Sequence, residues 1–138
     1  HICIYIKELN ALFTGDTLFS LGCGRIFEGT YDEMYKSLNK LKKFPKNTKI
    51  YCGHEYTKKN SDFCFSIDKE NSKLLNKIKK IKKDIQNGNP TIPTILSDEI
   101  ECNIFLRTDN LKIQKQIGVN SNNPIETFTK LRDLKDNF

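Results

Sequence analysis

The sequence lacks tryptophan, has one methionine and two histidines, and contains no long apolar run. A helix needs about 20 consecutive apolar residues to cross a bilayer, so no membrane-spanning segment is expected. Two histidines also limit metal chemistry, because a catalytic zinc ion takes about three protein ligands and a two-metal site takes more. This chain alone is therefore not expected to complete a catalytic metal site.

The five cysteines are odd in number, widely spaced and include no CxxC pair. This spacing argues against a disulfide framework and favours reduced thiols in a reducing compartment. We therefore expect a cytoplasmic protein, with an organellar form as the alternative. The sequence also lacks an initiator methionine and a signal-peptide pattern, and it opens at His1 on an apolar run. From this we expect the natural protein to continue upstream.

The composition is that of a globular protein on the polar side. The sequence has 138 residues, of which 37% are hydrophobic and 29% are charged, and its mean hydropathy is -0.57. The formal net charge of +6 and the pI near 9.0 favour an anionic partner. Nucleic acid, an acidic lipid surface and a charged small molecule all satisfy that condition.

Short strands and turns alternate in the first part of the chain. The runs Ile2–Ile6, Ala11–Phe13 and Lys49–Cys52 are rich in residues that favour strands. Before the third run, Thr30 and Glu33 have the spacing of a capping box and precede an apolar stripe at helical spacing. The sequence therefore predicts a β–turn–α–β pattern in which two polar turns follow strand ends.

From about Tyr56 onward the strand pattern disappears and helical spacing takes over. Apolar residues predict a long helix that ends at Asn87–Gly88, followed by shorter helical segments around 98–105 and 111–117. A final helix is marked by an Asn-Pro start and an apolar stripe. The predicted fold class is α/β over residues 1–56, followed by an all-α part over 57–138.

Two of the polar turns carry side chains that can bind metal. Asp16 in "FTGDTLF", taken alone, is more simply an aspartate that hydrogen-bonds its own turn. A lone histidine such as His54 in "YCGHEY" is more often structural. Because both residues end neighbouring strands, they can also form a carboxylate–imidazole pair that suits zinc or iron.

Basic residues offer a second candidate site. Arg25 follows the glycines of "GCGR", and Arg132 and Lys135 are spaced i, i+3 on the final helix. The simpler interpretation of the helical pair is a solvated polar face. If the three cations converge, they make a site for a dianion. The lysine-rich run 77–85 is typical of an amphipathic surface helix, and no aromatic RNA-binding strand or zinc finger supports a nucleic-acid role.

Three segments together resemble one family. "FTGDTLFSLGCGRIFEGTYDEM", "YCGHEYT" and "LRDLKDNF" resemble glyoxalase II, the hydroxyacylglutathione hydrolase family of the metallo-β-lactamase superfamily. The likeness runs nearly from end to end and includes "NPTIP" and "NIFLR". It implies that residues 1–56 are the second part of an αββα metallo-β-lactamase-like domain. Residues 57–138 would then be an α-helical substrate-binding domain.

The resemblance implies two divalent metal ions, with zinc expected and iron or manganese as the alternatives. Asp16 would bridge the two ions and His54 would bind the second ion. His1 resembles the last residue of an H-T-x-G-H motif whose first histidine is a ligand, so most ligands would lie upstream. The chain alone is therefore expected to be inactive.

The implied reaction is hydrolysis of the thioester S-D-lactoylglutathione to D-lactate and glutathione, a step of methylglyoxal detoxification. Metal ions lower the pKa of bound water to about 7, so a hydroxide nucleophile is available at neutral pH. They also stabilise the oxyanion that forms during attack.

The family holds the glutathione moiety with residues that map onto Arg25, Tyr56, Arg132 and Lys135. Phe27 stands where many relatives have a tyrosine, so the hydrogen bond of that hydroxyl would be missing. The expected partner is a small-molecule glutathione thioester, with no nucleic acid and no membrane, and the expected assembly is a monomer or a weak homodimer.

Two alternatives remain at this point. Another metallo-β-lactamase-type enzyme, such as a persulfide dioxygenase, shares GDT-like and GCGR-like turns, but the helical part that carries Arg132 and Lys135 argues against it. The second alternative is an inactive fragment, or a module that only binds glutathione conjugates.

Overall fold

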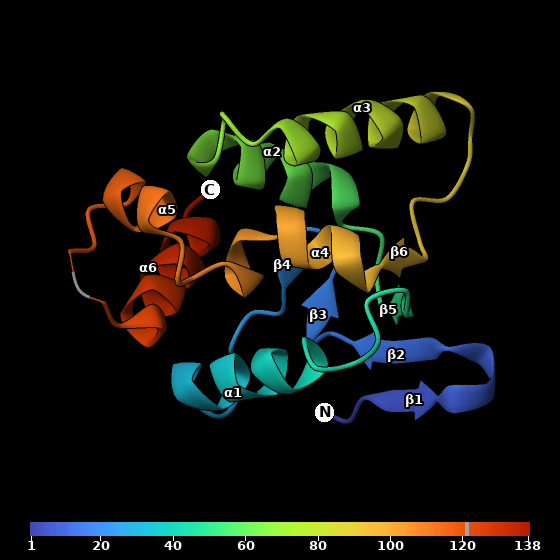
Figure 1. Cartoon of the computed structure of the whole chain (residues 1–138), viewed down its shortest axis with the longest axis horizontal. Helices are drawn as coiled ribbons and strands as arrows, with labels where there is room; N and C mark the ends of the chain where they lie inside the picture. The colour runs from blue at the N-terminus through green and yellow to red at the C-terminus, as the bar shows by residue number, and fades with distance from the viewer. Residues whose placement is uncertain (121) are drawn as a thin grey trace.

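The computed structural model describes residues 1–120 and 122–138 and contains a small mixed sheet with helices packed around it (Figure 1). The strands of that sheet lie in the order β1 (Ile4–Ile6), β2 (Ala11–Gly15), β5 (Lys49–Cys52) and β6 (Thr94–Ile95). β2 and β5 are parallel, whereas β1 and β6 are antiparallel to their neighbours. The 3-10 turn Lys7–Leu9 joins β1 to β2.

The connection between the two parallel strands contains the predicted helix. α1 spans Tyr31–Leu41, and Thr30 begins it with both hydrogen bonds of a capping box to Glu33. Before α1, the strands β3 (Leu18–Phe19) and β4 (Gly22–Cys23) form a separate two-stranded hairpin. This hairpin places Gly24 of "GCGR" beside the turn that follows β2, where its N–H donates to the carbonyl oxygen of Thr17 at 3.2 Å.

The second part of the chain is mostly helical, as the sequence predicts. Its elements are α2 (Thr57–Ile67), α3 (Ser72–Gln86), α4 (Leu96–Cys102), the 3-10 turn η2 (Ile104–Leu106), α5 (Leu111–Gln116) and α6 (Pro124–Asp136). α2 packs against α3, and α6 packs against α1 (Figure 1). Within the described residues, no helix is both long and apolar enough to cross a membrane.

The expectation that strands end at Tyr56 is wrong in one place. The short strand β6 returns from the helical part and pairs with β5, with Thr94 opposite Ile50. A strand of two residues shows no alternation of apolar and polar positions, so the sequence pattern could not reveal it. As a result, the helical part contributes directly to the sheet.

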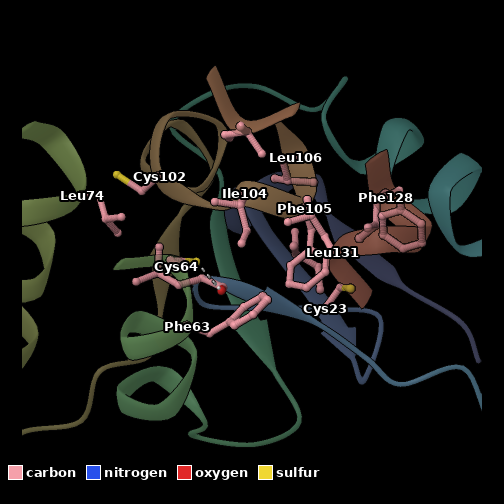
Figure 2. Packing of buried hydrophobic residues seen from close by; sticks show 14 of the residues in the cluster. Cys23, Phe63, Cys64, Leu74, Cys102, Ile104, Phe105, Leu106, Phe128 and Leu131 are labelled. Carbon is pink, nitrogen blue, oxygen red and sulfur yellow. Dashed lines mark hydrogen bonds between the residues drawn. The ribbon is translucent and has the colours of Figure 1, made fainter. Parts of the chain in front are cut away.

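The hydrophobic core contains buried residues from both sides of residue 56. Phe105 lies at its centre, with its ring centroid 6.1 Å from that of Phe63 and 6.0 Å from that of Phe128 (Figure 2). Leu12 and Ile50 of the sheet belong to the same cluster. All five cysteines are free, as their spacing predicts. The division into domains at residue 56 stays a prediction.

A fully buried carboxylate joins the hairpin to the helices. Glu99 accepts hydrogen bonds from the backbone N–H of Leu21 (2.7 Å), from Lys77 Nζ (2.9 Å), from the Thr94 hydroxyl (2.6 Å) and from the Asn103 amide (3.1 Å). Leu21 has a φ of 58°, which is uncommon for a residue with a side chain. Burial opposes the charge of Lys77, but the adjacent carboxylates of Glu99 and Asp98 raise its pKa. The sequence analysis did not identify this network.

Candidate functional site

Asp16 and His54 lie together at one edge of the sheet. The parallel register sets Gly15 opposite Cys52, so the residues that follow β2 and β5 leave the sheet side by side. His54 Nε2 is 3.6 Å from Asp16 Oδ1, and the two side chains are 52% and 45% exposed. Both side chains are therefore accessible to a ligand, as a metal-binding pair must be.

Two glycines make room for Asp16. A Cβ atom on Gly53 would lie 2.5 Å from Asp16 Oδ1, and one on Gly24 would lie 1.9 Å from the Asp16 carbonyl oxygen. At Gly24 the obstacle is a backbone atom, so only glycine fits there, whereas at Gly53 it is the end of the Asp16 side chain, which an added Cβ atom would displace. Gly24 thus leaves room for the backbone carbonyl of Asp16, and Gly53 leaves room for its carboxylate.

The donor chemistry of Asp16 and His54 fits a divalent metal ion, but the ligand set is incomplete. Across residues 1–120 and 122–138, no group of three or more His, Cys, Asp or Glu side chains could hold an ion. A catalytic zinc ion takes about three protein ligands. Asp16 and His54 alone therefore fall short of the ligand number of a catalytic zinc site.

Aromatic side chains fix the position of the His54 ring. The Tyr56 ring stacks on it at 5.0 Å between centroids and an interplanar angle of 18°. Phe19 of β3 contacts both rings, at 6.3 Å from His54 and 5.3 Å from Tyr56. Tyr56 therefore supports the imidazole as well as lining the adjacent cavity.

Glu55 explains another part of the "GHEY" motif. Its Oε1 accepts hydrogen bonds from the backbone N–H groups of Thr91 (2.6 Å) and Ile92 (3.2 Å). These bonds attach the turn that carries His54 to the proline-containing loop before β6. The carboxylate thus holds the turn in place and does not face the cavity.

A cavity of about 700 Å³ lies beside Asp16. It brings together six of the seven site residues that the sequence analysis singles out, namely Asp16, Arg25, Phe27, Tyr56, Arg132 and Lys135. His54 does not line the cavity and is linked to it through Asp16. Arg25, Arg132 and Lys135, which come from distant parts of the chain, therefore line one cavity.

Arg132 does not belong to a solvated polar face, so that interpretation is wrong for it. The residue is 3% exposed, and its Nη1 donates to the carbonyl oxygens of Cys23 (2.8 Å) and Gly24 (3.4 Å). Among the described side chains, its Nε is the buried polar atom that lacks a hydrogen-bond partner. A buried donor without a partner costs about 1–3 kcal/mol.

Lys135 is half-buried and lies on aromatic rings. Its Nζ is 5.1 Å from the centroid of the Phe63 ring and 5.2 Å from that of Phe138, and it donates to the carbonyl oxygen of Lys59 (3.3 Å). Burial, followed by the charges of Lys59 and Arg132, lowers the pKa of Lys135 to about 8. Its ammonium is therefore close to losing its proton at slightly alkaline pH.

Arg25 and Phe27 lie at the exposed side of the cavity. The Arg25 guanidinium carbon is 5.7 Å from the centroid of the Phe27 ring. Arg25 Nε pairs with Asp136 Oδ1 at 3.3 Å, and Arg132 Nη2 binds the same oxygen at 2.8 Å. Asp136 thereby links two of the cations, although the sequence analysis did not single it out. Its signal was the i, i+4 spacing from Arg132.

Comparisons with known proteins match the two parts of the chain separately. Residues 55–138 match the family model described as hydroxyacylglutathione hydrolase C-terminus, and residues 1–54 match that of the metallo-beta-lactamase superfamily. The chain belongs to the hydroxyacylglutathione hydrolase family. The predicted α/β fold class with a helical second part is confirmed.

Curated relatives named hydroxyacylglutathione hydrolase align with the whole chain. The protein from Pelagibacter ubique (strain HTCC1062) is 54% identical over 138 residues, which are 100% of this chain and 52% of the relative. The protein from Psychromonas ingrahamii is 46% identical over 142 aligned residues, covering 100% of this chain and 55% of the relative. The protein from Rhodospirillum rubrum is 43% identical, covering 100% and 54%. The chain thus spans about half the length of the curated relatives it matches.

Within the hydroxyacylglutathione hydrolase family match, the cavity is shared between the two matched segments. Asp16, Arg25 and Phe27 come from the metallo-beta-lactamase segment, whereas Tyr56, Arg132 and Lys135 come from the hydrolase C-terminal segment. Divalent metal chemistry is implied by the superfamily match.

Proposed function

We propose that this chain is the substrate-binding portion of a thioester hydrolase that cleaves S-D-lactoylglutathione to D-lactate and glutathione. The observation that carries the proposal is the cavity that joins Asp16 to Arg25, Arg132 and Lys135. The names of the relatives support the same reaction for the complete protein. We further propose that this reaction serves methylglyoxal detoxification.

The positively charged residues of the cavity are complementary to the negative charge of glutathione. The tripeptide moiety carries carboxylates at neutral pH, and charged groups of opposite sign orient such a ligand. Lys135 would bind a carboxylate through its ammonium, and the guanidinium of Arg132 adds positive charge to the lining of the same cavity. Tyr56 and Phe27 would cover the less polar part of the ligand, and Arg25 would close its exposed side.

Asp16 and His54 would hold divalent metal, Asp16 as the ligand shared between two ions, with the other ligands outside this chain. When bound, the ions would supply an activated water nucleophile at neutral pH and stabilise developing negative charge. We propose zinc, with iron or manganese as the alternatives. The residues of this chain hold the glutathione moiety beside Asp16, so that the thioester carbonyl comes next to the metal-binding pair.

The chemistry of the leaving group determines whether the protein must supply a general acid. Glutathione leaves as a thiolate, which is stable enough to depart without a strong general acid. The cavity accordingly needs no acid positioned over the sulfur. The five free cysteines favour a cytoplasmic protein, and we propose a monomer or a weak homodimer.

The proposal is tested on the complete protein that contains this chain. We expect metal-loaded enzyme to hydrolyse S-D-lactoylglutathione, measured by loss of the thioester absorbance. Lys135→Ala should raise KM with kcat nearly unchanged, because Lys135 binds the substrate away from the reacting carbonyl. Lys112→Ala is the matched control, since this exposed lysine on α5 pairs with Glu70 outside the cavity.

Other outcomes separate the alternatives. Oxygen consumption with glutathione persulfide, without thioester hydrolysis, would identify a persulfide dioxygenase instead. Binding of glutathione conjugates by the metal-loaded complete protein without any turnover would support the binding module. Either result overturns the hydrolase proposal.

A further inference from the structure

Lys59 contributes a further positive charge to the lining of the cavity. It lies in the first turn of α2, lines the cavity together with Arg132 and Lys135, and is exposed. Its backbone carbonyl oxygen accepts the hydrogen bond from Lys135 Nζ at 3.3 Å. The ammonium of Lys135 is therefore held against the first turn of α2, in the segment that carries the Lys59 side chain.

The stability of α2 does not explain a lysine at this position. The first turn of the helix contains no acidic residue, and Tyr56 provides no side-chain cap. A positive charge near a helix N-terminus is opposed by the helix dipole, so Lys59 weakens the helix slightly. Its neighbour Lys58 is compensated by Asp62, whose Oδ2 lies 3.3 Å from the Lys58 ammonium. In the described part of the chain, neither Lys59 nor Lys135 forms an ion pair with a carboxylate.

Charges around Lys135 come from α2 and from its own helix, α6. On α2, Lys59 repels it, whereas Asp62 and the Cys64 thiol act in the opposite direction, and on α6 Arg132 repels it. Burial and these repulsions lower the pKa of Lys135 to about 8. The cavity thus contains concentrated positive charge that an anion from outside would relieve.

We propose that Lys59 and Lys135 together bind one carboxylate of the glutathione moiety, which makes Lys59 a specificity-determining residue of this site. The inference rests on the proposed function, because it assigns a further contact to the same substrate. It also requires that binding be coupled to proton uptake above about pH 8. The ligand's negative charge favours the charged form of Lys135, so the lysine takes up a proton when the ligand binds.

The test uses calorimetric titration of the metal-loaded complete protein with S-methylglutathione, a thioether that cannot be hydrolysed. Lys59→Gln should weaken binding about three- to five-fold, whereas Lys58→Gln should leave the affinity nearly unchanged. Lys58→Gln removes the same charge one residue away, outside the cavity, and so controls for net charge. Lys59→Arg should retain the affinity, and thermal unfolding checks that each variant is folded.

Titrations at about pH 8.5 in two buffers of different ionisation enthalpy give the number of protons taken up. Lys59→Gln should reduce that number, because Lys135 without its repelling neighbour is already more protonated in the free protein. Two altered ligands identify which carboxylate Lys59 contacts. In one, the glycine carboxylate is converted to an ester, and in the other, the γ-glutamyl carboxylate is absent. For the ligand that lacks the contacted carboxylate, Lys59→Gln should no longer weaken binding.

The outcomes distinguish this inference from the function on which it rests. Equal affinities and equal proton uptake for Lys59→Gln and Lys58→Gln, in a protein that binds S-methylglutathione, would overturn the role of Lys59 alone. The role of Lys59 would also be overturned if Lys59→Gln weakened the binding of both altered ligands as much as that of S-methylglutathione. Absence of binding and of thioester hydrolysis in the unmodified protein would overturn both proposals.

Discussion

At the scale of single residues, Lys135 combines its proposed binding role with a pKa that burial lowers. In the folded protein the pKa is about 8, whereas the ordinary lysine value is 10.5. Below about pH 8 the ammonium is charged and can bind a carboxylate. As the pH rises through 8 the charge is lost, so we expect KM for a glutathione thioester to increase on the alkaline side.

Lys135→Met should raise KM at neutral pH and remove this alkaline increase, which steady-state kinetics from pH 6 to 9.5 would measure. If KM of the Lys135→Met variant still rose near pH 8, the titration would belong to another group.

The lowered pKa of Lys135 affects folding stability in the opposite direction to substrate binding: binding weakens as the pH rises, whereas stability increases. Between about pH 8 and 10.5 the unfolded chain binds more protons at this site, so this group alone makes stability increase with pH.

Gly53 shows how one residue can affect the metal-binding pair without being a ligand. Because a Cβ atom at Gly53 would meet Asp16 Oδ1 at 2.5 Å, Gly53→Ala should displace the carboxylate. We expect the complete protein to lose most of its bound metal while it stays folded, measured by elemental mass spectrometry and circular dichroism.

Gly88→Ala is the control for Gly53→Ala. Gly88 has a φ of 71° and no atom within 4 Å of the added Cβ, so alanine there is strained without touching the cavity. This control should lose about 1 kcal/mol of stability and keep its metal. Normal metal content in Gly53→Ala would show that Asp16 has room to move.

At the scale of secondary-structure elements, Glu99 holds the β3–β4 hairpin to the helices. Glu99→Ala would leave the ammonium of Lys77 and the N–H of Leu21 without their buried acceptor. Removing one partner of a buried ion pair costs about 3–5 kcal/mol. We therefore expect a strong loss of stability in urea unfolding of the complete protein.

Glu101→Ala on the same helix is the matched control for Glu99→Ala. Glu101 is partly exposed and pairs with Lys73, so its removal should cost no more than about 1 kcal/mol. If the two variants lost the same stability, the Glu99 network would not be a structural link between the hairpin and the helices.

The element scale also shows what sequence patterns could and could not predict. The capping box at Thr30 and Glu33 is local in the sequence, and the predicted start of α1 is confirmed. The pairing of β6 with β5 and the burial of Glu99 depend on residues more than forty positions away, which periodicity does not report. The convergence of the cations was expected only through the family resemblance, because spacing on α6 does not say what faces that helix.

At the scale of the whole molecule, the cavity depends on both matched segments. Arg132 on α6 donates to the carbonyl oxygens of Cys23 and Gly24 in the hairpin turn, and Asp136 joins it to Arg25. The helical part therefore holds the turn beside Asp16 and supplies part of the cavity lining.

The same arrangement makes a prediction about metal content. Asp16 and His54 are two donors, and the described residues offer no third within a common site. We expect the 138-residue chain, purified alone, to retain almost no metal in elemental mass spectrometry, and the complete protein to retain about two ions per chain. Asp16→Asn in the complete protein should lower that number, with the loss of thioester hydrolysis in parallel. Stoichiometric metal on the isolated chain would require ligands beyond Asp16 and His54, and would overturn our assignment of the remaining ligands to residues outside it.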